Sequence, residues 1–226
     1  MGQRRARQFH EKEARRQDIL AAATTIWDRV PFQVLTMSQV ARQTGLAKGT
    51  LYIYFKTKEE LFLAMAEEDL LGWYEELDEA LRRGPKLLSP RELASLVAGS
   101  LAGRPRLPRL LAILHTILEH NIPHLTALRS RQFLATRLLR TGRMLERRFP
   151  GLPEGRGAAL ALRIQSLVAG LWMPADPSPE VRQILDAPGL HMFRLDFSRD
   201  LEECLFALLA GLAAGAWLSP RPDNGG

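Results

Sequence analysis

The chain has 226 residues, 46% of them hydrophobic, and a formal net charge of +6, which is enough apolar material for two domains with buried cores. Its single cysteine, Cys204, cannot form an internal disulfide, so the composition excludes a disulfide-stapled scaffold and fits a reducing cytoplasm. Residues 1–16 lack the apolar stretch of a secretory signal, and the longest apolar run, residues 205–218, is shorter than the roughly 20 residues of a membrane helix.

The positive charge is concentrated at the amino-terminal end of the chain. Residues 1–58 contain eleven Lys and Arg against four Asp and Glu, which gives a net charge of +7. The remaining residues contain twenty basic and twenty-one acidic side chains, so their net charge is −1. A binding partner with many negative charges explains this asymmetry better than solubility does.

Residues 36–55 begin with a short helix that is predicted to end at a glycine. Thr36 and Gln39 have the spacing of a capping box, in which each side chain bonds the backbone amide of the other residue. A helix should therefore begin directly after Thr36. Gly45 permits the left-handed backbone conformation that ends such a helix.

A second helix is predicted over residues 47–54, with Leu51 and Phe55 as its inward-facing anchors. Thr57 and Glu60 then form another capping box, which starts the next helix at once. Two short helices joined by a glycine are the layout of a helix-turn-helix, which places its second helix in the major groove of DNA. An ordinary helical hairpin with tyrosines in its core is the alternative, but it would not explain the local positive charge.

Helical periodicity continues along the chain and no convincing strand pattern of period two occurs, so we predict an all-α fold of about nine or ten helices. Ser89-Pro-Arg-Glu92 is a further capping box, with proline at the first helical position. The segments 1–8 and 219–226 are expected to be flexible tails. The helices predicted after the helix-turn-helix cover about 57–83, 90–102, 105–120, 125–149, 154–173, 180–185 and 198–218.

Residues 14–74 resemble the DNA-binding domain of the tetracycline-repressor (TetR) family of bacterial transcription regulators. The resemblance is carried by GLAKGTLYIYFKTKEEL at residues 45–61, together with ILAAA at residues 19–23 and LTM at residues 35–37. Where the family usually has a glycine after the first helix, this chain has Val30-Pro31, and we expect an altered corner there. The resemblance implies a DNA-binding domain at 14–74, with its helix-turn-helix at 36–55, and a helical effector-binding and dimerisation domain at 75–218.

The resemblance places most of the DNA contacts on the second helix of the helix-turn-helix. Lys48 can donate to guanine or to phosphate, and Gly49 has no side chain to prevent close approach. Thr50 can bind phosphate or touch a thymine methyl group. Tyr52 and Tyr54 are expected to reach phosphates through their hydroxyls, with the alternative that one of them belongs partly to the core.

Other predicted DNA contacts flank this helix. Thr36 and Ser38 lie at a helix amino terminus, where backbone amides and the helix dipole favour a phosphate, and Lys58 is placed likewise at the start of the next helix. A basic N-terminal segment either enters the minor groove or, as we favour, stays near the phosphates. It consists of Arg4, Arg5 and Arg7.

The predicted helices over 154–173 and 198–218 both carry wide apolar faces. Burial within the same subunit would account for part of this surface. The TetR resemblance implies that the two helices also pack against their symmetry mates in a homodimer. The two reading helices of such a dimer would bind half-sites of a palindromic operator about one helical turn, roughly 34–36 Å, apart, or a multiple of that.

The resemblance also implies a small-molecule effector that binds the second domain and releases a repressor from its operator, with activation as the alternative direction. Sparse charge on the inner helix faces suggests an apolar or aromatic effector. The alternative function is an architectural DNA-binding protein with no effector. Five side chains are candidates to line the effector cavity, although each taken singly is better explained as ordinary core: Trp73, His115, Phe133, Met144 and Trp172.

No metal site, cofactor or enzymatic activity is predicted. His115, Glu119, His120 and His124 suggest a metal site, but Pro123 interrupts the helix that would bring the last two together. No nucleophile–base pair, phosphate loop or carboxylate pair has the spacing that catalysis needs. We therefore expect a cytoplasmic, nucleoid-associated regulator that is not a membrane protein and whose partners are double-stranded DNA, a second copy of itself and a small molecule.

Overall fold

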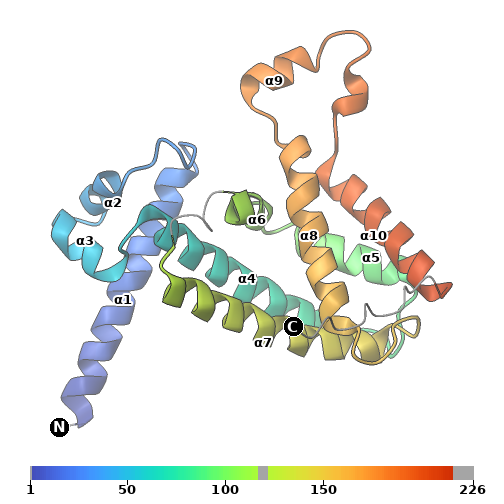
Figure 1. Ribbon diagram of the computed structural model, residues 1–226, viewed down its shortest axis with the longest axis horizontal. Coiled ribbons are helices and arrows are strands. Elements are labelled where there is room, and N and C mark those ends of the chain that lie inside the picture. The colour runs from blue at the N-terminus through green and yellow to red at the C-terminus, as the bar shows by residue number, and fades with distance from the viewer. Residues whose placement is uncertain (1, 117–121, 216–226) are drawn as a thin grey trace, which may run out of the picture. The chain divides into compact units, whose positions relative to one another are not determined.

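The computed structural model describes residues 2–116 and 122–215, and within these ranges every regular element of secondary structure is a helix (Figure 1). The predicted all-α class is confirmed. This part of the chain contains ten α-helices and a short 3-10 helix, η2 (His191–Phe193). The α-helices are α1 (Gly2–Trp27), α2 (Met37–Gln43), α3 (Lys48–Tyr54), α4 (Lys58–Arg83), α5 (Pro90–Ser100), α6 (Arg106–Thr116), α7 (His124–Arg148), α8 (Gly157–Ala175), α9 (Pro179–Ile184) and α10 (Phe197–Ala213).

The chain forms two compact units. The first contains the residues up to Glu68 together with Ile113–Arg131, and the second contains Asp69–Ala112 and the residues from Gln132 onward. Helices α4 and α7 each supply residues to both units. The units divide within α4, whereas the sequence analysis placed the domain boundary after residue 74; the roles assigned to the two domains stay predictions.

The helix boundaries lie close to the predicted ones, with differences at the amino terminus and at the end of α10. Helix α1 begins at Gly2, so residues 2–8, which were expected to be flexible, are helical. Arg7 Nε donates to Glu11 Oε1 at 2.9 Å, the i,i+4 arrangement that supports a helix. Helix α10 ends at Ala213, five residues before the predicted end at 218, and Gly215 follows with a left-handed φ of 86°. The predicted helix end at residue 120 and the tail at 219–226 fall outside the described residues.

The core of the first unit is aromatic. The Phe62 ring on α4 makes T-shaped contacts with Trp27 at 5.4 Å and with Phe32 at 4.8 Å between ring centroids, and all three side chains are buried. Phe32 directly follows Val30-Pro31, where the Leu35 N–H donates to the Pro31 carbonyl at 3.2 Å. Residues 30–35, where this chain lacks the family's usual glycine, therefore form a turn. Phe32 in this turn packs into the core of the first unit.

In the second unit, α10 packs against both α5 and α8 (Figure 1). Leu201, Leu205, Leu209 and Leu212 of α10 are buried, and their spacing of four and three residues places them on one face of the helix. The opposing faces of α5 and α8 supply further buried apolar side chains, among them Leu93, Val97, Leu160, Ile164 and Val168.

Helices α7 and α8 touch through their backbones. A Cβ atom at Gly142 would overlap the backbone of Gly157 and Ala158, and a Cβ atom at Gly157 would overlap the backbone of Gly142. Glu146 Oε1 also accepts the Gly157 N–H at 2.7 Å, which satisfies the first amide of α8. Both glycines are therefore required by the close approach of the two helices.

A buried polar cluster lies between α4, α7 and α8 in the second unit. The Tyr74 hydroxyl donates to Gln165 Oε1 at 2.9 Å, and the Thr141 hydroxyl donates to Asp78 Oδ1 at 2.6 Å. Arg140 Nε lies 2.8 Å from the other oxygen of Asp78. Burial, and secondly the negative charge of Asp78, raises the pKa of Tyr74, so its hydroxyl remains a donor. These bonds fix how α4 packs on its two neighbours.

Candidate DNA interface

Helix α2 begins at the predicted capping box. The Gln39 N–H donates to Thr36 Oγ1 at 3.3 Å, and the Thr36 N–H donates to Gln39 Oε1 at 2.7 Å. Leu35 and Val40 are buried on either side of the cap, and α2 packs against α1 and α3. Thr36 and Ser38 are exposed at this helix end, as a phosphate contact requires. The contact itself stays a prediction.

Gly45 makes the turn between α2 and α3, as predicted. Its φ of 66° lies in the left-handed region, which is strained for residues with a side chain. The Gly45 N–H donates to the Arg42 carbonyl at 3.2 Å, and the Leu46 N–H donates to the Ala41 carbonyl at 2.9 Å. The last carbonyls of α2 are thereby satisfied, and the chain is directed into α3.

Helix α3 is buried on one side and open on the other. Leu51 and Phe55 are buried, as predicted, and the Arg16 guanidinium of α1 lies 5.5 Å from the Phe55 ring centroid. Lys48 and Gly49 are exposed at the start of the helix. The helix is thus anchored on the first unit while its amino-terminal end faces solvent.

The other predicted contacts on α3 are partly accessible. Thr50, Tyr52 and Tyr54 are all half-buried, so neither tyrosine is a fully buried core residue. Lys48 Nζ lies 6.0 Å from the Tyr52 ring centroid, at the outer limit of a cation–π contact. The structure therefore brings Lys48 and Tyr52 together on one part of the helix surface.

Gly49 and Ile53 lie one turn apart on the exposed side of α3. A Cβ atom at Gly49 would meet nothing within 4 Å, so the packing of this chain does not require glycine there. Ile53 is 66% exposed. Sequence reasoning missed Ile53, although its signal was present, because Leu51 and Phe55 already fill the buried positions of this short helix. An exposed apolar side chain here can contact a thymine methyl group.

Lys58, which was predicted to contact a phosphate, bonds the backbone of the first unit, and the phosphate contact stays a prediction. Lys58 Nζ donates to the Phe32 carbonyl at 2.7 Å and to the Leu35 carbonyl at 3.1 Å, and it lies 4.1 Å from the Phe32 ring centroid. Burial lowers the pKa of Lys58, while the negative charge of Glu59 opposes this shift. The ammonium therefore ties the corner before α2 to the first turn of α4.

The start of α4 is capped by a variant of the predicted box. The Glu60 N–H donates to Thr57 Oγ1 at 3.1 Å, but the Glu60 carboxylate accepts from the Lys56 N–H at 2.6 Å instead of from Thr57. Its other oxygen accepts from the Thr126 hydroxyl at 3.1 Å. Glu60 thus joins the first turn of α7 to the junction between α3 and α4.

The basic N-terminal segment is part of α1. Arg7 is exposed and paired with Glu11. The side chains of Arg4 and Arg5 lie outside the described part of the structure. Their predicted contacts with DNA are therefore untested by this structure, and stay predictions.

The aromatic candidates for the effector cavity have partners within the second unit. Trp73 is fully buried, and its indole N–H donates to Ser100 Oγ at 2.8 Å. Trp172 at the end of α8 makes a T-shaped contact with Phe197 at the start of α10, with 5.2 Å between ring centroids. Trp73 is therefore a core residue of the second unit. Trp172 and Phe197 hold together the two ends of the segment between α8 and α10.

The remaining candidates give no cavity by themselves. Phe133 and Met144 are half-buried on α7, and the side chain of His115 lies outside the described part of the structure. Two hollows of about 350 and 320 Å³ are described, one on α5 and α10 and one at the end of α8, and neither is lined by any of the five candidates. The effector cavity stays a prediction.

The residues considered for a metal site are mostly outside the described structure. The side chains of His115, Glu119 and His120 are not among the described residues, and His124 is exposed at the start of α7. Among the side chains that are described, no group of three His, Cys, Asp or Glu could hold a metal ion.

Two family models together match nearly the whole chain. The model of the bacterial regulatory proteins of the tetR family matches residues 19–65. The model of the tetracyclin repressor-like C-terminal domain matches residues 67–216, which is more than half of the chain.

Curated relatives match mainly over a short stretch. An uncharacterized HTH-type transcriptional regulator, YfiR of Bacillus subtilis (strain 168), is 36% identical over 72 residues, 32% of each chain. The fatty acid metabolism regulator protein of the same organism is 26% identical over 88 residues, 39% of this chain and 44% of that protein. The matched parts therefore span less than half the length of these relatives.

Solved structures share the fold over most of the chain. FadR of Thermus thermophilus, a TetR-family repressor solved with lauroyl-CoA, has a TM-score of 0.55 at 23% identity and covers 93% of this chain and 100% of its own. The TetR-family repressor AlkX of Dietzia sp. has a TM-score of 0.54 at 16% identity, covering 88% and 95%. These likenesses confirm the fold, and the family consists of regulators, in agreement with the expectation that the chain is not an enzyme. Because both family models match, the chain belongs to the TetR family of bacterial regulatory proteins.

Proposed function

We propose that this protein is a transcriptional repressor that binds a palindromic operator as a homodimer and leaves it when a small molecule binds the second unit. The observation that carries the DNA-binding part is the open side of α3. There Lys48, Gly49 and Ile53 face solvent, while Leu51 and Phe55 hold the helix on the first unit.

The exposed side of α3 has the chemistry of a major-groove reader. Lys48 supplies a cation for guanine or phosphate, and Ile53 supplies an apolar group for a thymine methyl. Gly49 lies between them and leaves room for the edges of the bases. The half-buried Tyr52 and Tyr54 can direct their hydroxyls to the phosphates on either side. The exposed first turn of α2 offers further amides to the backbone.

The proposed dimer interface consists of α8 and α10. Among the described helices, α8 alone is long and apolar enough to cross a membrane. Only 28% of this apolar stretch is buried. Core helices of soluble proteins meet the same criterion, so this is weak evidence for a membrane. A partner helix accounts better for the incomplete burial, and the outward Leu162 and Met173 are exposed where it would pack.

The DNA-binding proposal can be tested by replacing glycine with leucine on α3, with the same replacement on α5 as the control. Gly49→Leu has open space and should stabilise α3 by about 0.5–1 kcal/mol, because glycine is a poor helix former. It should nevertheless weaken operator binding by at least about tenfold, because the side chain occupies space that the groove needs. The operator is first identified by genome-wide mapping of bound DNA, and binding is then measured by gel shift.

Gly99→Leu on α5 is the matched control, since a Cβ there also meets nothing within 4 Å. It should leave operator binding unchanged. Equal operator affinity for both variants and the parent chain would contradict the assignment of α3. Lys48→Ala and Tyr52→Ala should likewise abolish operator binding while the protein remains a folded dimer.

The effector part of the proposal is separated from the architectural alternative by ligand screening. Thermal-shift measurements would use acyl-CoA thioesters, free fatty acids and uncharged aromatic compounds. We expect a compound that raises the melting temperature and also releases the operator in the gel shift. A protein that keeps the same operator affinity with every compound would be an effector-independent DNA-binding protein. Either protein would act in the bacterial cytoplasm, on the nucleoid when bound to DNA.

A further inference from the structure

The segment between α8 and α10 has regular structure but no core of its own. From Asp176 to Asp196, which includes α9 and η2, not one residue is buried. We call this segment the 176–196 arm, and Figure 1 shows it extending beyond the ends of α8 and α10. Its leucines Leu185, Leu190 and Leu195 are only half-buried, so hydrophobic burial within this chain contributes little to the structure of the arm.

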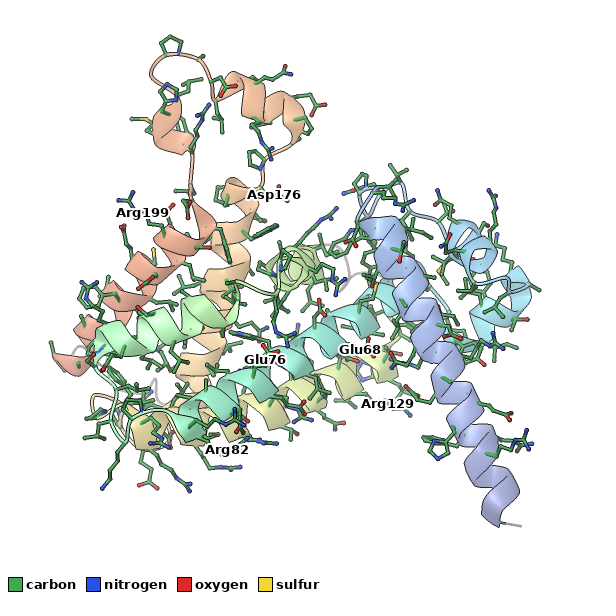
Figure 2. The ribbon with its side chains drawn as sticks, turned by 180° about the vertical axis from the view of Figure 1, so that it is seen from behind. Glu68, Glu76, Arg82, Arg129, Asp176 and Arg199 are labelled. Carbon is green, nitrogen blue, oxygen red and sulfur yellow. The ribbon has the colours of Figure 1, made fainter. Side chains whose placement is uncertain are left out.

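Polar contacts within the arm hold its shape. Arg182 lies 3.7 Å from Asp176 between charged atoms, and Arg194 forms an ion pair with Asp186. The Ser178 hydroxyl caps α9. Figure 2 labels Asp176 where the arm leaves α8, and Arg199 in the first turn of α10 beyond its other end. These contacts favour one shape of the arm in the free chain, and a segment that is already ordered loses less entropy on binding.

The arm presents large apolar side chains to solvent. Met192 is 77% exposed, Ile184 is 59% exposed and Phe193 is 57% exposed, and Val181 is exposed on the same α9 as Ile184. Single exposed apolar residues are ordinary, but several on one short segment without a core indicate a binding surface. Methionine and phenylalanine are enriched in the buried centres of protein interfaces.

The charge of the arm excludes two classes of partner. It carries four acidic side chains against two basic ones, a net charge of −2. Nucleic acid and anionic membrane surfaces both attract Lys and Arg, so neither fits this segment. A protein surface remains.

The positions of the two ends of the arm indicate that the partner is a second copy of this chain. The arm leaves α8 and returns to α10, the two helices of the proposed dimer interface, and the Trp172–Phe197 contact holds these ends together. Its residues therefore begin and end at the surface that a second copy would cover. We propose that the 176–196 arm packs against the second copy of this chain in the homodimer, with Met192 and Phe193 buried at the contact. This inference rests on the proposed homodimer.

The first test measures dimer stability. The double variant Met192→Ser/Phe193→Ser should dissociate into monomers at least about tenfold more readily than the parent chain in sedimentation equilibrium. Leu87→Ser is the matched control, because Leu87 is also 57% exposed but lies in the loop between α4 and α5. The control should leave the dimer unchanged. Circular dichroism of both variants checks that the helix content is retained.

The second test identifies what the arm touches. Phe193 is replaced by the photocrosslinking residue p-benzoylphenylalanine in the full chain, and isotopically heavy and light chains are mixed before illumination. We expect crosslinked peptides that join a heavy chain to a light one. Crosslinks found only within one chain, or only to another protein in cells, would overturn the proposal, as would an unchanged dissociation constant for the double variant.

The two proposals fail in different ways. If the double variant stays as dimeric as the parent chain and binds the operator equally well, the role of the arm is wrong and the dimeric regulator stands. If the parent chain is monomeric and binds no operator, the proposed function itself is wrong.

Discussion

Lys58 makes contacts that its position at the start of a helix does not suggest. As the first residue of a helix, it would ordinarily be solvated or face a phosphate. Here its ammonium donates to the carbonyls of Phe32 and Leu35 and lies over the Phe32 ring. These acceptors belong to the corner formed by Val30-Pro31, more than twenty residues earlier. A local pattern around Lys58 contains no information about that corner.

Lys58→Met should therefore reduce stability more than it reduces DNA contact. The substitution leaves two part-buried carbonyls without their donor, which should lower the free energy of unfolding by about 1–3 kcal/mol. Thermal and urea unfolding would measure the loss. Lys56→Met, two residues earlier and exposed, is the control and should be nearly neutral. Unchanged unfolding together with weaker operator binding would instead favour the phosphate contact that the sequence suggested.

Among the elements, α7 and α8 depend on each other most directly. Glycine inside or beside a helix usually indicates weakness or an end. Gly142 and Gly157 are instead the two places where the helix backbones meet. No spacing rule along the chain pairs these residues, because their contact depends on how the two helices cross.

Gly142→Ala should destabilise the second unit even though alanine is the better helix former. The new methyl group would overlap the backbone of α8, and overpacking of this kind costs about 1–3 kcal/mol. Gly99→Ala, with open space around its Cβ, should be neutral or stabilising by up to about 1 kcal/mol. Urea unfolding of both variants gives the comparison. Equal stability of the two would show that the helices can separate without cost.

At the scale of the whole molecule, local rules predicted the order and extent of the helices. Capping pairs such as Thr36–Gln39 and Ser89–Glu92 act within one turn, so they can be recognised without knowing the fold. The same local rules predicted the helix-turn-helix and its inward anchors, and the family resemblance then supplied the expected DNA contacts. The exposure of Ile53 follows from the same local spacing and was missed, because Leu51 and Phe55 already fill the buried positions of α3. The backbone contacts of Lys58 and the coreless 176–196 arm could not be predicted in this way, because each depends on surfaces distant in sequence or belonging to a partner.

The contact between Gly142 and Gly157 also limits how α7 can move. Since the two backbones already touch, α7 cannot come closer to α8, and sliding would drive it into Ala158. Of the simple displacements, only rotation about the crossing point avoids this overlap. The crossing point therefore sets both the separation and the register of α7 and α8, and any rearrangement within the second unit has to keep it in place.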